Sequence, residues 1–149
     1  NAIVPVRPGA EALACAQVRI HEKTLARQLG AETAPFHEVD TRATLDTAID
    51  AIGVPAVLKT RRFGYDGKGQ AKILSRSDAD EAWATMRGQP SILEGFVTFD
   101  REVSVVAARS LNGAFRAFEV TENEHRNHIL HRSVAPARLG AQAATEALE

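Results

Sequence analysis

The sequence predicts an α+β chain, a mixed α/β arrangement in which short strands pair as antiparallel hairpins between helices. Two observations support this fold class. Apolar residues at helical spacing alternate along the chain with short apolar runs that are typical of buried strands. Asn112-Gly113 lies between the strand-like runs 102–110 and 114–120, and this dipeptide strongly favours a tight hairpin turn.

Composition limits the classes of function. The chain has 149 residues, of which 44% are hydrophobic and 25% charged, as in a globular protein of one domain or two small subdomains. The net charge of −1 gives no overall attraction to nucleic acid or to a membrane surface. The single Cys15 excludes an internal disulfide framework and favours a reducing, cytoplasmic location. The sequence contains no run of roughly 18 apolar residues, so it predicts no membrane span. Because the sequence lacks an initiator Met and stops within a helical pattern, we expect a fragment of a longer chain.

The first half of the chain predicts two helices. Residues 10–29 have helical spacing, and Gly30 suits the position just after a helix end. Residues 41–52 predict a second helix, with Thr41 as its N-cap and Gly53 at its end.

A hairpin with a long glycine-rich tip follows. The run 55–59 predicts a short buried strand, and 70–74 predicts the strand that returns. Ser77 and Asp80 have the spacing of a capping box, which predicts the start of a third helix. Its expected inner face consists of Ala79, Ala82, Trp83 and Met86.

The second half predicts mainly strands. Residues 91–97 form another strand-like run, and 102–120 predict the Asn-Gly hairpin. The polar segment 121–128 predicts a loop, 129–137 a further strand, and the last residues a helix.

The loop in VLKTRRFGYDGKGQ, residues 57–70, points to an anion. Glycines allow backbone N–H groups to approach a ligand, and several such groups form a nest for an anion. Phosphate is the anion that we expect this loop to bind, because four cationic side chains flank the glycines in the sequence. The glycines are Gly64, Gly67 and Gly69, and the cations are Lys59, Arg61, Arg62 and Lys68.

Other interpretations of this loop remain open. Turn glycines at a solvated hairpin tip would give a similar composition, and a GxxG loop with basic flanks also occurs in one RNA-binding fold. The loop is neither a P-loop nor a dinucleotide fingerprint, since no helix is predicted to follow its glycines.

The segment ILEGFVTFDREVSVV suits a nucleoside. An irregular stretch between two strands separates Glu94 from Glu102. Backbone groups there could pair with a base, and an ionised carboxylate can accept hydrogen bonds from both ribose hydroxyls. Taken singly, Glu94 is better explained as a strand-end charge facing water, and Glu102 as the first residue of a strand on a solvated face.

Three histidines, His125, His128 and His131, fall within the segment VTENEHRNHILHRS. Their spacing matches no standard zinc site, and Cys15 is remote in the sequence. We therefore predict no metal site among these residues.

Together the three segments 57–70, 94–113 and 122–137 resemble the carboxyaminoimidazole ribonucleotide synthases, the ATPase subunits of phosphoribosylaminoimidazole carboxylase, within the ATP-grasp superfamily. The resemblance extends from about Val4 to the end of the chain. It implies an ATP-grasp fold, with nucleotide held between two subdomains that contain antiparallel sheets. Residues 1–17 would then end an N-terminal domain or linker, 18–95 would form the lid subdomain, and 96–149 would begin the C-terminal subdomain.

The resemblance implies an ATP-dependent ligase of purine biosynthesis. Such enzymes join bicarbonate to the amino group of aminoimidazole ribonucleotide through carboxyphosphate, with ATP and Mg²⁺. The metal ligands are expected downstream of this chain, so the fragment alone is expected to be inactive. The partners implied are small-molecule substrates and neither nucleic acid nor membrane, and a homodimer is compatible with the resemblance.

The resemblance also assigns site residues position by position. Arg19 and Lys59 would contact the ATP phosphates, the loop from Gly64 to Gln70 would fold over them, and Tyr65 and Lys68 would contact the ribonucleotide or bicarbonate. Glu94 to Val97 would hold the adenine, Glu102 the ribose, and His125 would lie beside the nucleotide. The implied nucleotide-binding set is Arg19, Lys59, Gly64, Tyr65, Asp66, Gly67, Lys68, Gly69, Gln70, Glu94, Gly95, Phe96, Val97, Glu102 and His125.

Two positions depart from the family pattern. Val18 stands where a carboxylate precedes the arginine, which would loosen the placement of Arg19, and His128 stands where a glycine is usual. Two alternatives of function stay open: another ATP-grasp carboxylase or ligase, and a non-catalytic nucleotide-binding module.

Overall fold

The structure is a computed structural model that describes residues 4, 6–62, 69–127 and 129–148. It divides into two compact units, Asn1–Val97 and Thr98–Glu149. Helices and antiparallel sheets are present in both, which confirms the predicted α+β class. None of the helices among the described residues has the length and apolar character needed to cross a bilayer.

The first unit contains four α-helices and a short 3₁₀ turn among its described residues. They are α1 (Ala10–Gln17), α2 (Arg19–Gln28), α3 (Arg42–Ile52), the 3₁₀ turn η1 (Arg76–Asp78) and α4 (Ala79–Met86).

The prediction of one helix over residues 10–29 is wrong, because the chain breaks at Val18. This residue has extended backbone angles, φ −121° and ψ 108°, between α1 and α2. Helical spacing continues through the break, so the pattern of apolar residues does not reveal it. The predicted end of the segment is confirmed: Gly30 has φ +88°, and its N–H and that of Ala31 donate to carbonyls of the last turn of α2.

Helix α3 begins and ends as predicted. The Thr41 side chain accepts from the backbone N–H of Thr44, whose hydroxyl oxygen accepts in turn from the N–H of Thr41. Gly53 ends the helix with φ +85° and ψ −175°, a combination that favours glycine.

The predicted cap of the third helix is wrong, because α4 has no side-chain cap and a capping box instead begins η1, the 3₁₀ turn that leads into α4. The capping box consists of Ser75 and Asp78 rather than Ser77 and Asp80, and the Asp78 carboxylate accepts from the N–H groups of Leu74 and Ser75 at 2.8 and 2.9 Å. Asp80 forms an ion pair with Arg42 of α3 at 2.6 Å instead. Both pairs have the same spacing, so the sequence alone did not distinguish them.

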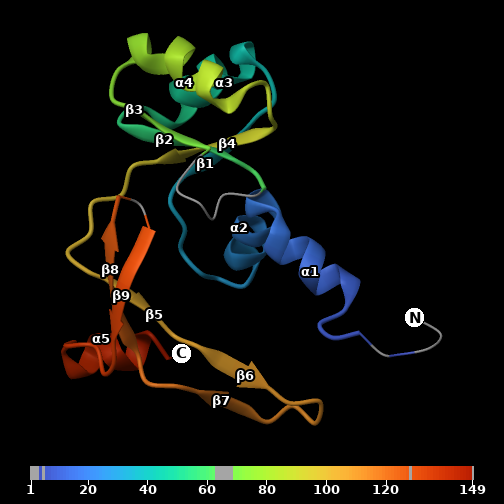
Figure 1. The fold of residues 1–149 in the computed structure, drawn as a ribbon, viewed down its shortest axis with the longest axis vertical. Helices are drawn as coiled ribbons and strands as arrows, with labels where there is room; N and C mark the ends of the chain where they lie inside the picture. Colours follow the sequence, from blue (N-terminus) through green and yellow to red (C-terminus); the bar gives the residue numbers. More distant parts are fainter. Residues whose placement is uncertain (1–3, 5, 63–68, 128, 149) are drawn as a thin grey trace. The chain divides into compact units, whose positions relative to one another are not determined.

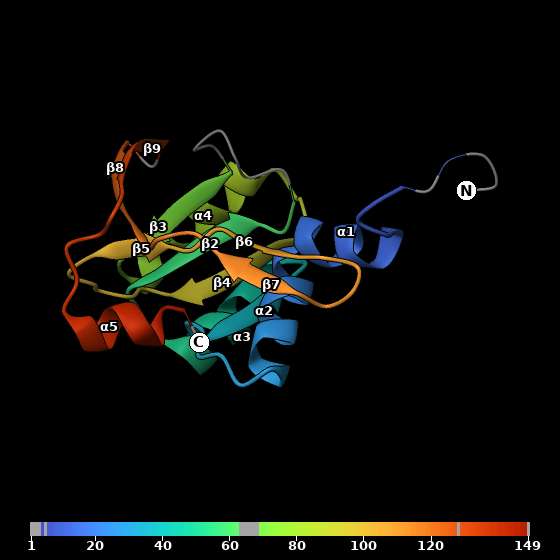
Figure 2. The ribbon, with the colours of Figure 1, turned by 90° about the horizontal axis from the view of Figure 1, so that it is seen from below.

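A four-stranded antiparallel sheet forms the centre of the first unit. Its strands follow the order β1-β4-β2-β3, and Figure 2 shows β3, β2 and β4 side by side. The predicted hairpin of 55–59 and 70–74 is confirmed by the pairing of β2 with β3. The bounds are β1 (Phe36–Val39), β2 (Ala56–Thr60), β3 (Gln70–Ile73) and β4 (Ser91–Gly95).

The two faces of this sheet differ. One face packs against α3 and α4, which lie together on it in Figure 1, and this layer holds the hydrophobic core. Its members include Leu45, Leu58, Ile73, Met86 and Leu93, all buried. The predicted inner face of α4 is confirmed, with Ala79, Ala82 and Met86 buried and Trp83 packed against the core. By strand alternation the opposite face carries Phe36, Lys59, Gln70 and Glu94.

The second unit contains five strands and one helix among its described residues. They are β5 (Glu102–Ser104), β6 (Ala107–Arg109), β7 (Phe115–Ala117), β8 (Thr121–Arg126), β9 (Ile129–Val134) and α5 (Ala141–Glu146). Strands β5, β8 and β9 form one antiparallel sheet in that order, and β6 pairs with β7.

Two sequence predictions fail in this unit. The polar segment 121–128 is not a loop, because residues 121–126 form the central strand β8. Polar side chains pair across that strand, as in the hydrogen bond between the hydroxyls of Ser104 and Thr121 at 2.8 Å, so no apolar alternation marks it. The run 102–110 also splits into β5 and β6, which join different sheets. The predicted bend at Gly113 is confirmed, with φ +87°.

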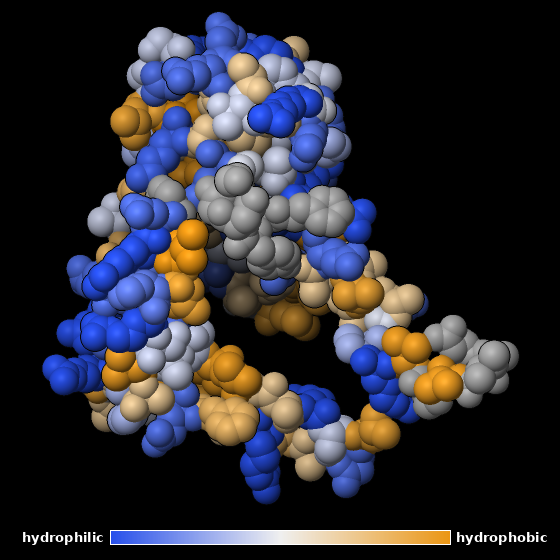
Figure 3. All heavy atoms as spheres, viewed as in Figure 1, coloured by the Kyte–Doolittle hydropathy of each residue, from blue (hydrophilic) through white to orange (hydrophobic). Residues whose placement is uncertain are grey.

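The β6–β7 ribbon is exposed on both strands. In the space-filling view of Figure 3, orange apolar atoms lie beside blue polar ones along it. Its exposed large apolar side chains include Leu111, Phe115 and Phe118.

Candidate functional site

The site residues expected from the sequence fall into two groups, one in each unit. Arg19, Lys59, Gly69, Gln70 and Glu94 to Val97 belong to the first unit, and Glu102 and His125 to the second. The expected residues Gly64, Tyr65, Asp66, Gly67 and Lys68 lie outside the described residues, as does His128.

Two lysines converge on one buried carboxylate in the first unit. Lys59 Nζ donates to Glu94 Oε2 at 2.9 Å, and Lys23 Nζ lies 3.6 Å from the same oxygen. The Glu94 side chain is only 9% exposed, and the two lysine side chains are 26% and 21% exposed. One carboxylate between two ammonium groups leaves a net charge of +1 in a partly dehydrated place, which favours an anion.

The strands explain how Glu94 reaches this position. It lies on the inner strand β4, directly opposite Phe36 of β1 and Val57 of β2. Lys59 lies two residues beyond Val57 on the same face, and its direct partner on β3 is Gln70. The apolar run of β2 thus delivers an ammonium group beside a buried carboxylate and at the root of the glycine loop.

The second oxygen of Glu94 has an unusual environment. Oε1 is buried, and no hydrogen-bond partner for it exists among the described residues. A buried acceptor without a donor is unfavourable by about 1–3 kcal/mol. A ligand that brings an N–H or O–H group to this oxygen would remove that cost.

Arg19 is anchored next to Lys59. Its backbone N–H donates to the carbonyl of Arg61 at 3.1 Å, and its Nε donates to the carbonyl of Thr60 at 3.2 Å. Val18 provides no side-chain cap to α2, so these two bonds to the end of β2 locate the start of the helix. The structure therefore ties Arg19 to the end of β2, the strand that carries Lys59, and pairs Lys59 with Glu94.

The backbone after Glu94 is already partly hydrogen-bonded. The N–H of Gly95 donates to the carbonyl of Pro35 at 2.9 Å, and the N–H of Phe96 donates to that of Pro55 at 3.1 Å. These two amides are therefore not free edge donors. A base held by this segment would depend on the carbonyl groups and on Val97.

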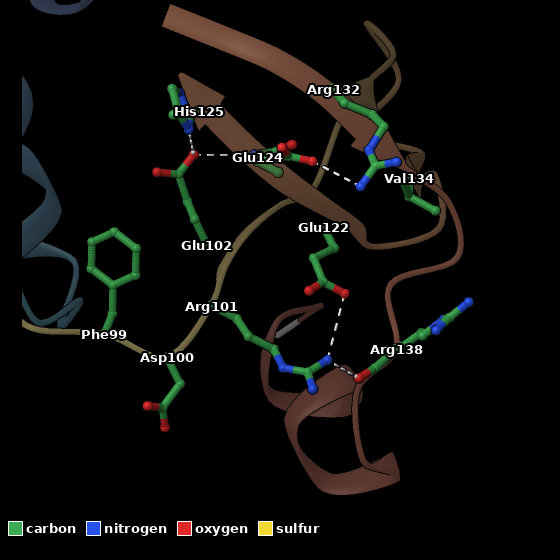
Figure 4. A pocket seen from close by; sticks show the side chains of 11 residues that line it. Phe99, Asp100, Arg101, Glu102, Glu122, Glu124, His125, Arg132, Val134 and Arg138 are labelled. Carbon is green, nitrogen blue, oxygen red and sulfur yellow. Dashed lines mark hydrogen bonds and ion pairs between the residues drawn. The ribbon is translucent and has the colours of Figure 1, made fainter. Parts of the chain in front are cut away.

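The second unit brings Glu102 and His125 together. His125 Nδ1 lies 3.4 Å from Glu102 Oε1, and Asn123 Nδ2 donates to the same oxygen at 3.3 Å. Glu102 and Asn123 are directly opposite each other on β5 and β8, and His125 lies two residues further along β8. Figure 4 shows the Glu102 and His125 side chains pointing toward each other at one side of a pocket.

The pocket has the size of a small-molecule site, and charged and polar side chains form most of its lining. Its volume is about 670 Å³, within the range of about 300–1,000 Å³ common for ligand pockets. Charged groups on its walls neutralise each other, as with Arg132 and Glu124 at 2.8 Å and Arg101 and Glu122 at 3.5 Å. The hydrogen bond from Arg126 lowers the pKa of Glu124, with a further contribution from Arg132. Glu124 is therefore a structural carboxylate that stays ionised and holds two arginines.

The described residues show no preformed cluster of metal ligands. Across 6–62, 69–127 and 129–148, no three His, Cys, Asp or Glu side chains come together in a way that could hold a metal ion. No chemical step is therefore assigned to a metal in this chain.

Sequence reasoning missed two features of the site. Lys23 was not selected, although it lies one helical turn after Arg19 on α2, where residues four apart share a face. The roles of Asn123 and Ser133 were also missed, because they depend on which strands pair.

Several known proteins are similar to this chain. The chain is 46% identical over 143 residues to the N5-carboxyaminoimidazole ribonucleotide synthase of Pseudomonas aeruginosa, covering 96% of this chain and 40% of that protein. The structure of the N5-carboxyaminoimidazole ribonucleotide synthetase from Thermus thermophilus matches this chain with a TM-score of 0.88 and 40% sequence identity. The match covers 99% of this chain and 39% of that one. The Staphylococcus aureus synthetase complexed with ADP has TM-score 0.86 and 35% identity, covering 94% and 38%.

The chain therefore spans 40% of the length of the Pseudomonas relative. The family model described as "ATP-grasp domain" matches residues 24–149, which is most of the chain. The chain belongs to the ATP-grasp family.

Proposed function

We propose that this chain is the ATP-binding part of an enzyme that carboxylates aminoimidazole ribonucleotide with bicarbonate in purine biosynthesis. The observation that carries the proposal is the cluster of Lys23, Lys59 and Glu94, a site with excess positive charge at the root of the glycine loop. The relatives are named after the carboxylated ribonucleotide, which supports this choice of substrate.

The proposed reaction has two steps. A bicarbonate oxygen attacks the γ-phosphorus of ATP, and ADP leaves, which gives carboxyphosphate. The amino nitrogen of the ribonucleotide then attacks the carboxyl carbon, phosphate leaves, and the nitrogen loses a proton. Both steps depend on stabilising charge on phosphoryl oxygens, which is the role of positioned cations in phosphoryl transfer.

Each described residue has a stated part in this proposal. Lys59 and Arg19 neutralise phosphate oxygens, the segment from Glu94 to Val97 holds the adenine, and Glu102 accepts from the ribose. In the absence of nucleotide, Glu94 serves as the counter-ion of Lys59. His125 borders the ribose site through its contact with Glu102.

The remaining parts of the proposal come from the resemblance. Tyr65 and Lys68 contact the ribonucleotide or bicarbonate. Other parts of the full-length protein supply the Mg²⁺ ligands, and the enzyme works in the cytoplasm, in keeping with the single Cys15. A homodimer is part of the same proposal.

The test uses the full-length protein with ATP, aminoimidazole ribonucleotide and ¹³C-labelled bicarbonate. We expect release of ADP and phosphate that requires both co-substrates, and label in an N-carboxy product by NMR. ATP turnover with glycinamide ribonucleotide instead would identify another ligase of the same family. Nucleotide binding without any turnover would identify a non-catalytic module.

A further inference from the structure

Asn123 lies at the centre of a polar ladder that crosses three strands. It is directly opposite Glu102 of β5 on one side and Ser133 of β9 on the other. Side chains directly opposite each other in an antiparallel sheet lie about 4.5–5.5 Å apart at Cβ, so short polar side chains can touch. All three residues belong to the second unit, and the ladder ends at the pocket that Glu102 and His125 line.

The hydrogen bonds of the ladder fix the orientation of the Asn123 amide. Ser133 Oγ donates to Asn123 Oδ1 at 2.8 Å. The other end of the amide, Nδ2, donates to Glu102 Oε1 at 3.3 Å and to Ser104 Oγ at 3.1 Å. An amide nitrogen has two hydrogens, so both are used. The reverse orientation would place the amide oxygen against a carboxylate, which is unfavourable.

The same contacts orient the Glu102 carboxylate. Asn123 and His125 both approach Oε1, so the carboxylate is held from one side. In Figure 4 the dashed lines meet at this oxygen, and the other oxygen of Glu102 points away from them. The Glu102 side chain is 41% exposed, so a ligand can reach that second oxygen.

We propose that Asn123 is a positioning residue for Glu102 and that Ser133 fixes the Asn123 amide, so that Glu102 presents its second oxygen to a ribose hydroxyl of the bound nucleoside triphosphate. This inference rests on the proposed function. Asn123 touches the carboxylate rather than the nucleotide, and its effect passes through Glu102. A preoriented acceptor loses less side-chain entropy on binding than a freely rotating one, which strengthens the hydrogen bond to the ribose.

The experiment compares two ligands in the full-length protein. Calorimetry gives the Kd of ATP and that of 2′,3′-dideoxy-ATP, which lacks both ribose hydroxyls. In the unmodified protein we expect the dideoxy nucleotide to bind about tenfold to a hundredfold more weakly, the effect of hydrogen bonds to a charged group. The ratio of the two Kd values reports the ribose contact alone, because triphosphate and adenine contacts cancel.

The variants then separate positioning from general damage. Asn123→Ala and the isosteric Asn123→Asp should reduce the ratio to the value of Glu102→Ala. Ser133→Ala should reduce it partly, and Ser133→Thr, which keeps the hydroxyl, should retain it. Gln142→Ala is the matched control, since Gln142 Nε2 donates to the Glu146 carboxylate at 2.9 Å on α5, away from the ladder. Its ratio should not change.

Two results would overturn the inference, and they differ in meaning. If both Asn123 variants weaken the two ligands equally and leave the ratio unchanged, Asn123 has only a structural role, and the proposed function stands. If the unmodified protein does not discriminate between the ligands, the ribose role of Glu102 fails and the positioning role fails with it. Carboxylation of aminoimidazole ribonucleotide, measured separately, then shows whether the rest of the proposed function survives.

Discussion

Lys59 and Glu94 join β2 to β4 through an ion pair of 2.9 Å between Nζ and Oε2. The carboxylate is nearly buried and the ammonium group is half-buried, and Lys23 of α2 approaches the same oxygen. In the proposed enzyme a phosphate would compete with Glu94 for these cations. In that enzyme the ion pair would hold the Lys59 side chain in place and balance its charge until the nucleotide binds.

Lys59→Met should weaken ATP binding by roughly 1.5–3 kcal/mol and abolish nearly all carboxylation, because a charge-assisted contact to phosphate is lost. Lys59→Arg should bind ATP measurably but turn over more slowly, since its planar fork places the phosphate differently. Calorimetry and phosphate release measure the two effects. Arg116→Met, on the exposed strand β7, is the control that also loses one cation. Unchanged affinity in Lys59→Met would remove β2 and its loop from the phosphate site.

Lys23→Met should weaken ATP binding less than Lys59→Met does, by about 0.5–1.5 kcal/mol measured by calorimetry, because Lys59, the lysine closer to Glu94, remains in place.

Glu94→Gln should reduce the free energy of unfolding by about 1–3 kcal/mol, since two lysines then share an uncharged amide in a partly buried place. Urea unfolding of Lys23→Met, of Glu94→Gln and of the double mutant gives the coupling energy between Lys23 and Glu94. Strictly additive effects would contradict the cluster.

Asp78→Asn should make the stability of the first unit depend less on pH in the acid range. The backbone N–H bonds from Ser75 and Leu74 lower the pKa of Asp78 in the folded state. A lowered pKa contributes stability that is present above the unfolded pKa of about 4 and is lost as the pH falls through the folded pKa. Urea midpoints between about pH 6 and pH 3 should therefore fall less steeply in Asp78→Asn than in the unmodified protein. Parallel slopes in the two proteins would show that this cap does not contribute to the pH dependence.

Gly53→Ala should reduce the free energy of unfolding by about 1–3 kcal/mol, because φ +85° with ψ −175° is a region that side chains avoid. Nothing lies within 4 Å of the added Cβ, so the effect would come from the backbone alone. Gly9→Ala, where the space is equally open and φ is −65°, should reduce stability less than Gly53→Ala, because alanine can adopt this backbone and only the N-cap preference for glycine is lost. Urea unfolding compares them, and equal effects would refute backbone strain at Gly53.

Local signals in the sequence determined much of the first unit. The Thr41 cap, the ends at Gly30 and Gly53, the β2–β3 hairpin and the inner face of α4 all follow from short-range chemistry. The assignment of Arg19 and Lys59 to the ATP phosphates and of Glu94 to Val97 to the adenine came from the family resemblance rather than from periodicity, and it stays a prediction. Where two local signals were equivalent, as with the caps at Ser75 and Ser77, short-range chemistry could not distinguish between them.

Strand pairing decided the rest, because it joins residues that are far apart in the sequence. The polar strand β8 carries no apolar alternation, and only its position between β5 and β9 makes it a strand and brings Asn123 to Glu102 and Ser133. Lys23 reaches Glu94 because α2 begins at Arg19, after the break at Val18, and is tied to the end of β2 through Arg19. The amino-acid sequence thus supplied the chemical groups and the local elements, whereas the long-range pairing of β5, β8 and β9, and of α2 with the first sheet, determined which groups meet.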